Sequence, residues 1–167
     1  MVAYLREVPV GVPGTVIDYV RTIVDSGQYD PDLMPAAYGA PVKLVAGLVA
    51  AIESGDAATD FYGILARSNP GSSGDPSFNG FGAGVPVATQ IPSVVIGPVG
   101  GGRILVNCTI GTPVKGGIVY MRVTEDLPAL VGDLEANADG SANVALTSVV
   151  WGLNGKDTDG TAQVLFK

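Results

Sequence analysis

The sequence has no histidine, one cysteine and few charged residues, which make up 15% of its 167 positions. Histidine is the only side chain whose unperturbed pKa lies between about pH 5 and 8. Its absence removes the commonest general base and the commonest transition-metal ligand. A single cysteine also excludes an internal disulfide. These absences argue against an enzyme, and the sequence offers no catalytic residue, cofactor site or metal site that can be named.

The charge distribution and the lengths of the apolar runs exclude two kinds of partner. The net charge is -7 and the nine Lys and Arg residues are scattered, whereas nucleic-acid binding needs clustered basic residues. The longest apolar run, Leu44 to Ile52, is far shorter than the roughly 20 residues of a membrane-spanning helix. The N-terminal residues lack the pattern of a secretory signal, so we expect the protein to stay in the cytoplasm where it is made.

What the sequence has instead is 24 glycines, 12 prolines and many valine-rich runs. Strand-length runs separated by Gly/Pro turns are typical of an all-β sandwich or barrel. We therefore predict one all-β domain, a β-sandwich or jelly-roll-like barrel. After the central loop the predicted strands are Ser93–Ile96, Arg103–Ile110, Ile118–Thr124, Val131–Glu135, Val144–Val150 and Ala162–Phe166.

Three predictions in the first half of the chain rest on less regular patterns. Thr15 to Val24 is β-rich with two similar faces and is predicted as a strand. Residues 42–53 suit either a buried helix or two short strands, and we favour a hairpin because Gly47 divides them. The aromatic run Thr59 to Arg67 is predicted as a central strand, in which Gly63 marks a bulge or a close backbone approach.

Two segments are predicted to lie outside the regular β domain, which spans residues 15–167. Residues 1–14 contain Pro9 and Pro13 and are predicted as an extended arm. Residues 69–92 form a long Gly/Pro-rich loop, and a loop of this length is usually functional or disordered. Large apolar side chains on such segments need to be buried, either by a partner or by packing onto their own domain. The candidate partner contacts are Val10, Val12, Phe78, Phe81, Val85 and Val87.

Several polar motifs have simpler structural interpretations. The Gly100–Arg103 stretch lacks the GK[ST] ending of a phosphate loop and precedes a strand, so we predict a hairpin turn. Asp157–Gly160 has a fragment of calcium-loop spacing without the closing Glu. The pairs Asp30/Asp32 and Glu125/Asp126 fall in predicted turns, where solvated Asp is common. Cys108 lies in an apolar strand and is predicted to be structural.

The order of three sequence segments resembles the structural cement, or decoration, proteins of tailed-bacteriophage capsids. These segments are GVPGTVIDYV, GDAATDFYGILARS and GTPVKGGIVYMRVTEDLPALVGDLEA. The resemblance implies a small β-rich protein on the outer surface of an HK97-type shell in the virion. It also implies that the protein bridges neighbouring major capsid subunits and stabilises the head.

Composition and resemblance together suggest a homo-oligomer, a trimer or dimer on a capsid symmetry axis, with no direct contact to nucleic acid or membrane. A tail, fibre or baseplate component is an alternative, although the periodic short repeats of a fibre are not visible. A carboxylate-dependent β-sandwich hydrolase is a weaker alternative, motivated only by 16 acidic residues.

Overall fold

The computed structural model describes residues 11–17, 22–67, 92–96 and 102–167. These residues form ten strands and no helix, so none of them forms a helix that could cross a membrane. The strands are β1 (Val24–Ser26), β2 (Pro41–Val45), β3 (Leu48–Ala51), β4 (Gly63–Ala66), β5 (Ser93–Val95), β6 (Arg103–Asn107), β7 (Ile118–Arg122), β8 (Leu134–Glu135), β9 (Asn143–Trp151) and β10 (Thr161–Phe166).

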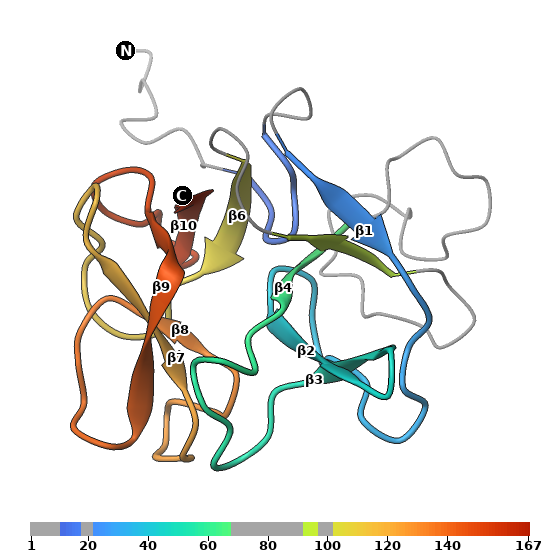
Figure 1. Cartoon of the computed structure of the whole chain (residues 1–167). Coiled ribbons are helices and arrows are strands. Elements are labelled where there is room, and N and C mark those ends of the chain that lie inside the picture. The colour runs from blue at the N-terminus through green and yellow to red at the C-terminus, as the bar shows by residue number, and fades with distance from the viewer. Residues whose placement is uncertain (1–10, 18–21, 68–91, 97–101) are drawn as a thin grey trace.

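The strands make two antiparallel five-stranded sheets, which confirms the predicted all-β class. The first sheet has the order β1-β5-β4-β2-β3 and the second has the order β6-β10-β9-β7-β8. In Figure 1 the first sheet lies on the right, in blue to lime, and the second on the left, in yellow to red. The chain therefore completes one sheet before it begins the other.

A shared apolar cluster holds the two sheets together. Ile64 and Val95 from the first sheet pack in one cluster with Ile104, Trp151 and many other residues of the second. The aromatic rings of Phe61 and Phe166 stack across this junction, with centroids 6.4 Å apart. A smaller cluster on the other face of the first sheet includes Tyr29, Tyr38, Val42, Val49, Leu65 and Val94.

The predicted hairpin at residues 42–53 is confirmed. Strands β2 and β3 pair directly, and the connecting residues Ala46 and Gly47 have φ values of 51° and 85°. Two consecutive positive φ values are the geometry of a two-residue type I′ turn, whose twist matches that of the flanking strands. The helix alternative for these residues is thereby excluded.

The strand predicted over Thr15–Val24 is wrong because this run serves both sheets. Val16 makes only an isolated bridge with Ile104 of the second sheet, whereas a strand begins at Val24 and pairs with Val95 of the first. The chain crosses between the sheets within this run, and residues 18–21 lie outside the described residues. This division explains why the two faces of the run look alike in the sequence.

The strand predicted over Thr59–Arg67 is shorter than expected. The Asp60 carboxylate accepts a 2.8 Å hydrogen bond from the Ala57 N–H and closes a turn, so the strand starts only at Gly63. The predicted close approach at Gly63 is confirmed, since a Cβ there would lie 2.7 Å from Cγ1 of Val94. The predicted Val131–Glu135 strand is likewise reduced to Leu134–Glu135.

Irregular chain covers the outer edge of β3. The Val49 N–H donates to the Gln28 carbonyl at 2.7 Å, and the Asp30 N–H donates to the Val49 carbonyl at 2.9 Å. A third bond runs from the Ala51 N–H to the Leu33 carbonyl at 2.7 Å. The segment around Asp30 and Asp32, predicted only as a turn, thus has a structural role, because it satisfies backbone groups that would otherwise be exposed.

Both outer strands of the second sheet are covered as well. Along β6, the Leu105 N–H donates to the Thr15 carbonyl at 3.0 Å, and the Ile17 N–H donates to the Arg103 carbonyl at 2.9 Å. At the opposite edge, the Thr109 N–H donates to the Leu134 carbonyl of β8 at 3.0 Å. The continuation of β6 therefore meets β8, and the second sheet closes on itself as a small barrel does.

A buried ionic network joins β7, β8 and β9. Arg122 and Glu135 are 1% and 0% exposed, and the Arg122 Nε donates to Glu135 Oε1 at 2.8 Å. The Arg122 Nη1 also donates to Asp139, and the Asn143 amide donates to the second Glu135 oxygen at 2.6 Å. Each buried charge has at least two polar partners, as burial of charge requires.

We predict that Glu135→Gln lowers the free energy of unfolding by about 3 kcal/mol, because it leaves the buried Arg122 without its buried counter-charge. Chemical denaturation monitored by the fluorescence of Trp151 measures this change. The matched control is Glu125→Gln, the same substitution at an exposed position, which should change stability by less than about 0.5 kcal/mol. Equal stability of the two variants would contradict the structural role of the network.

Candidate functional site

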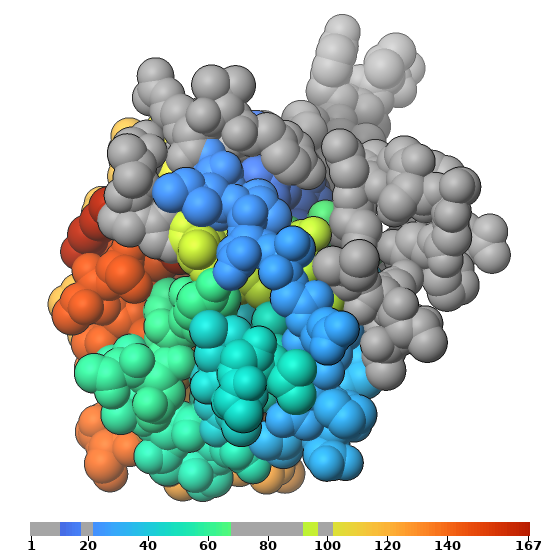
Figure 2. Space-filling model, turned by 45° about the vertical axis from the view of Figure 1, so that its right-hand side comes forward, coloured from blue at the N-terminus to red at the C-terminus, as the bar shows by residue number. Residues whose placement is uncertain are grey.

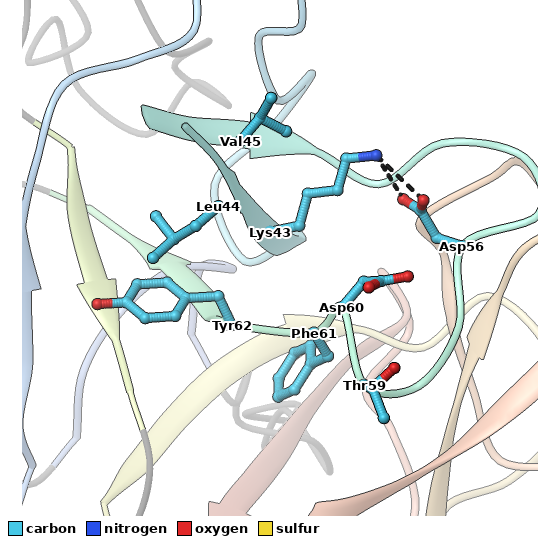
Figure 3. Close-up of a pocket in the computed structure, with 8 residues that line it drawn as sticks. All are labelled: Lys43, Leu44, Val45, Asp56, Thr59, Asp60, Phe61 and Tyr62. Carbon is cyan, nitrogen blue, oxygen red and sulfur yellow. Dashed lines mark hydrogen bonds and ion pairs between the residues drawn. The ribbon is translucent and has the colours of Figure 1, made fainter. Parts of the chain in front are cut away.

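A pocket in the described residues lies between the β2–β3 hairpin and the β3–β4 connection. It has a volume of about 430 Å³ and is shown in Figure 3. Lys43 extends from β2, and its Nζ lies 2.8 Å from a carboxylate oxygen of both Glu53 and Asp56. The other lining residues are Leu44, Val45, Thr59, Asp60, Phe61 and Tyr62.

The polar groups of this pocket are occupied by structural bonds. Burial alone lowers the pKa of Lys43, but the hydrogen bonds that its ammonium donates to Asp56 and Glu53 outweigh this effect and raise the pKa above its usual range. The lysine is therefore a permanent cation rather than a base. Asp60 already accepts the turn-closing N–H of Ala57. This arrangement can hold the β3–β4 connection against β2, and it contains no nucleophile paired with a base.

The tyrosine at the rim of this pocket ties β1 to the middle of the first sheet. The Tyr62 hydroxyl donates a hydrogen bond to Oδ2 of Asp25. This hydrogen bond, together with burial, raises the pKa of Tyr62 to about 12. The other Asp25 oxygen accepts the N–H of Ser26 at 2.9 Å. The carboxylate of β1 is thus bound on both sides within the protein.

Exposed large apolar side chains form two groups on the second sheet. The first, here called the tip patch, is Leu127 and Leu130, which are 76% and 50% exposed in the β7–β8 connection. The second, here called the base patch, is Val114, Ile118 and Leu153, which are 42% to 63% exposed. Exposed apolar side chains that lie close together are candidate contacts with another molecule.

The tip patch lies on a tightly bonded loop. The backbone groups of Asp126 and Ala129 bond to each other in both directions, at 3.1 and 2.9 Å. The Leu130 N–H donates to the carboxylate of Asp133 at 2.9 Å. Ala129 between the two leucines is 0% exposed and anchors the loop in the domain. The two leucines are therefore presented by preorganised backbone, which lowers the entropic cost of binding.

Two directly bonded loops carry the base patch. The Lys115 N–H donates to the Asn154 side chain at 2.8 Å, and the Gly155 N–H donates to the Pro113 carbonyl at 2.8 Å. Val114 and Leu153 lie within these bonded segments, and Ile118 opens β7 beside them. The base patch is thus a second fixed group of apolar side chains.

The two patches lie at opposite ends of the β7–β9 pair. Ile118 of β7 pairs near the end of β9, whereas Arg122, which leads into the tip patch, pairs with Asn143 at its start. Strand β9 has 9 residues, which corresponds to about 26 Å at about 3.3 Å per step. The β7–β9 pair, whose register shifts between Ile118 and Val119, therefore separates the two exposed apolar groups.

Of the contact residues predicted from sequence, the structure describes Val12 and leaves its role as a contact a prediction. Val12 is half-buried, and its carbonyl accepts the Thr15 N–H at 3.1 Å. Val10, Phe78, Phe81, Val85 and Val87 lie outside the described residues, as do most of the predicted arm, loop 69–92 and the Gly100–Gly101 turn. The tip and base patches were missed because most of their members are single apolar residues between the predicted strands, and Ile118 opens a predicted strand. The only available signal was a leucine or valine placed next to proline, as in Leu127–Pro128 and Pro113–Val114.

The polar motifs have structural roles where they are described. Asp157 Oδ1 accepts the N–H groups of Asp159 and Thr161 and closes the turn before β10. Asp30 makes a similar bond with the Asp32 N–H at 2.9 Å. No group of three or more metal-ligating side chains occurs within the described ranges. Cys108 is 1% exposed, and burial raises the pKa of its thiol, which suits a structural residue.

Comparison with known proteins gives one family and a related fold. The model of the family described as structural cement protein (E217 gp24/Pam3 gp6) matches residues 2–167. A chain from the solved structure titled "The capsid of Myoviridae Phage XM1" has a similar fold, with a TM-score of 0.69 and 21% sequence identity. The alignment covers 97% of this chain and 93% of that chain. No curated protein matches the sequence.

The bond between Tyr62 and Asp25 predicts a dependence of stability on alkaline pH. Because the pKa of Tyr62 is raised to about 12, against about 10 in unfolded chains, the stabilising contribution is complete below about pH 10. It is lost as the pH rises from about 10 to 12. The tyrosinate absorbance of wild type minus that of Tyr62→Phe gives the titration of Tyr62. We expect Asp25→Asn to move this titration back toward pH 10, and an unchanged curve would contradict the role of Asp25.

Proposed function

The chain belongs to the phage structural cement protein family, and from this we propose that it binds the outer surface of an HK97-type capsid shell. There it bridges neighbouring major capsid subunits and stabilises the head. Family membership makes it a structural protein of the virion, associated with the capsid. The outer placement and the bridging are our proposal, and the position of the two apolar patches supports them.

The observation that carries this proposal is the fixed separation of the tip and base patches. A protein that bridges subunits needs at least two contact surfaces, and the body between them must resist deformation. Here a hydrogen-bonded strand pair joins the patches. The buried Arg122–Glu135 ion pair stiffens the end of this pair from which the tip patch extends. Force applied at one patch is thereby transmitted to the other through a packed and bonded framework.

The composition supports contacts of apolar and main-chain character. The chain carries only 15% charged residues, so its binding to the shell should depend weakly on salt. The net charge of -7 disfavours contact with packaged nucleic acid. A cement protein of this kind acts by mass action, since binding the assembled shell better than free subunits raises the free energy needed to open it.

We also propose that the protein forms a dimer or trimer on a capsid symmetry axis. The exposed apolar patches favour association, and a weak contact between free copies can be completed once the shell holds them together. The alternative of a tail, fibre or baseplate component is less well supported, because both the family and the structural neighbour are named for capsid-associated proteins. The hydrolase alternative has no support from the geometry of the described carboxylates.

Paired substitutions test the bridging role. We predict that Leu127→Ser/Leu130→Ser and Val114→Ser/Leu153→Ser each weaken binding to heads at least tenfold, because burying one leucine contributes about 1.5 to 3 kcal/mol. Heads loaded with each variant are heated, and DNA release and occupancy are recorded. At protein concentrations that restore full occupancy, each variant should still fail to raise the release temperature, since one end no longer bridges.

The matched control for these variants is Leu44→Ser, which replaces a leucine that is 44% exposed and lies outside both patches. It should bind and stabilise heads as wild type does. If both double variants protect heads as well as wild type, the patches are not the bridging contacts. If wild type saturates heads without changing the release temperature, the protein decorates the shell and does not cement it.

The predicted arm and central loop are tested separately. We expect removal of residues 1–10, or Phe78→Ala/Phe81→Ala, to release the protein from heads without unfolding the β domain. This deletion ends before Gly14. It therefore keeps the 2.7 Å hydrogen bond from the Gly14 N–H to the Leu105 carbonyl, which covers the edge of β6. Circular dichroism confirms folding, and sedimentation with heads measures binding. Full binding by the truncated chain would remove the arm from the proposed contact surface.

A further inference from the structure

The outer edge of β1 differs from the three covered sheet edges. In the part of the chain that the structure describes, no segment pairs with this edge, and β1 has only β5 as a neighbour. All three residues of β1 are exposed, with Val24 at 41%. Figure 2 shows the blue atoms of this segment at the molecular surface. An open strand edge of this kind is a template for another strand.

The pairing with β5 fixes which backbone groups face outward. The Ile96 N–H donates to the Ile23 carbonyl at 3.1 Å, which makes these residues a hydrogen-bonded pair. Because such pairs alternate along antiparallel strands, Asp25 also faces β5 and Val24 and Ser26 face outward. The Ser26 N–H is taken by the Asp25 carboxylate at 2.9 Å. The edge therefore offers the N–H of Val24 and the carbonyl groups of Val24 and Ser26.

The carboxylate of Asp25, the charged residue of β1, does not cover the outward backbone groups of Val24. Natural sheets often protect an open edge with charged side chains or proline. β1 contains no proline or lysine, and the carboxylate of Asp25 is held by the Tyr62 hydroxyl and the Ser26 N–H. The bond to Tyr62 draws the side chain back across the sheet, toward a residue that precedes β4. Among the described residues, the backbone of β1 is thus left accessible.

We propose that an extended segment of the shell subunit pairs with β1 and adds a sixth strand to the first sheet. This inference rests on the proposed function and specifies one of its contacts. Main-chain hydrogen bonds supply the affinity in such strand addition, and the side chains that alternate along the added strand supply specificity. A partner strand with β-branched side chains beside Val24 and a basic side chain beside Asp25 matches the chemistry of the edge.

Charge argues against a second copy of this chain as the occupant. When two copies of β1 pair antiparallel about their common centre, Asp25 of one stands opposite Asp25 of the other. Like charges placed directly opposite each other destabilise a strand pair. The net charge of -7 on each copy adds repulsion at longer range. A segment of a different polypeptide avoids both costs.

The test uses heads of the parent phage assembled without this protein. Val24→Pro removes the outward N–H of Val24 and leaves the bonds to β5 intact, whereas Val24→Thr keeps the N–H and the β-branched shape. We expect Val24→Pro to bind heads roughly tenfold more weakly than wild type or worse, and Val24→Thr to bind within about twofold. Equal binding of the two variants would overturn the inference while leaving the proposed function in place.

Hydrogen exchange of the wild-type protein gives a readout that does not depend on a variant's folding. The Val24 amide should exchange quickly in the free protein and become protected on heads. Protection in free protein that sediments as a dimer would make a second copy the occupant and overturn the inference. Fast exchange on saturated heads would also overturn it. If wild type does not bind heads at all, the proposed function fails first and this contact fails with it.

Discussion

The fold depends on the closure of sheet edges by irregular chain. Short strands such as β3 and β6 would expose rows of backbone groups, and residues 28–33 and 15–17 cover them with hydrogen bonds. Cys108, which follows β6, likewise covers the edge of β8 through a bridge with Leu134. These hydrogen bonds hold the irregular segments in fixed positions against the strands. The loops are components of the sheets rather than simple links between strands.

The buried ion pair connects this framework to the tip patch, which we propose as a contact surface. Arg122 and Glu135 stand where the chain enters and leaves the connection that carries the tip patch. Their bond fixes the spacing of the two chain ends at its base. The buried charges of Arg122 and Glu135 therefore help to fix the position of the exposed leucines of the tip patch. Stability and recognition are coupled at this end of the molecule.

Strand content was predictable from the sequence, because valine-rich runs and Gly/Pro turns act locally. The second sheet follows the predicted runs closely, and the turn at Gly47 is set by its own residues. The Thr15–Val24 segment was not predictable in this way, since its partner changes between two sheets within a few residues. The apolar patches also escaped prediction. A leucine in a turn is exposed or buried according to the packing of distant strands, which no local pattern encodes.

The pairing of Ala66 with Ser93 has a consequence for how this family can diverge. Ala66 and Ser93 end and begin two strands that are antiparallel neighbours. The pairing of these strands therefore requires only that the two ends of the connecting residues lie close together. The entropy of closing such a loop grows with the logarithm of its length, and doubling the length costs only about 0.6 kcal/mol. Insertions and deletions between β4 and β5 can thus accumulate at little thermodynamic cost while the pairing of the two strands stays the same.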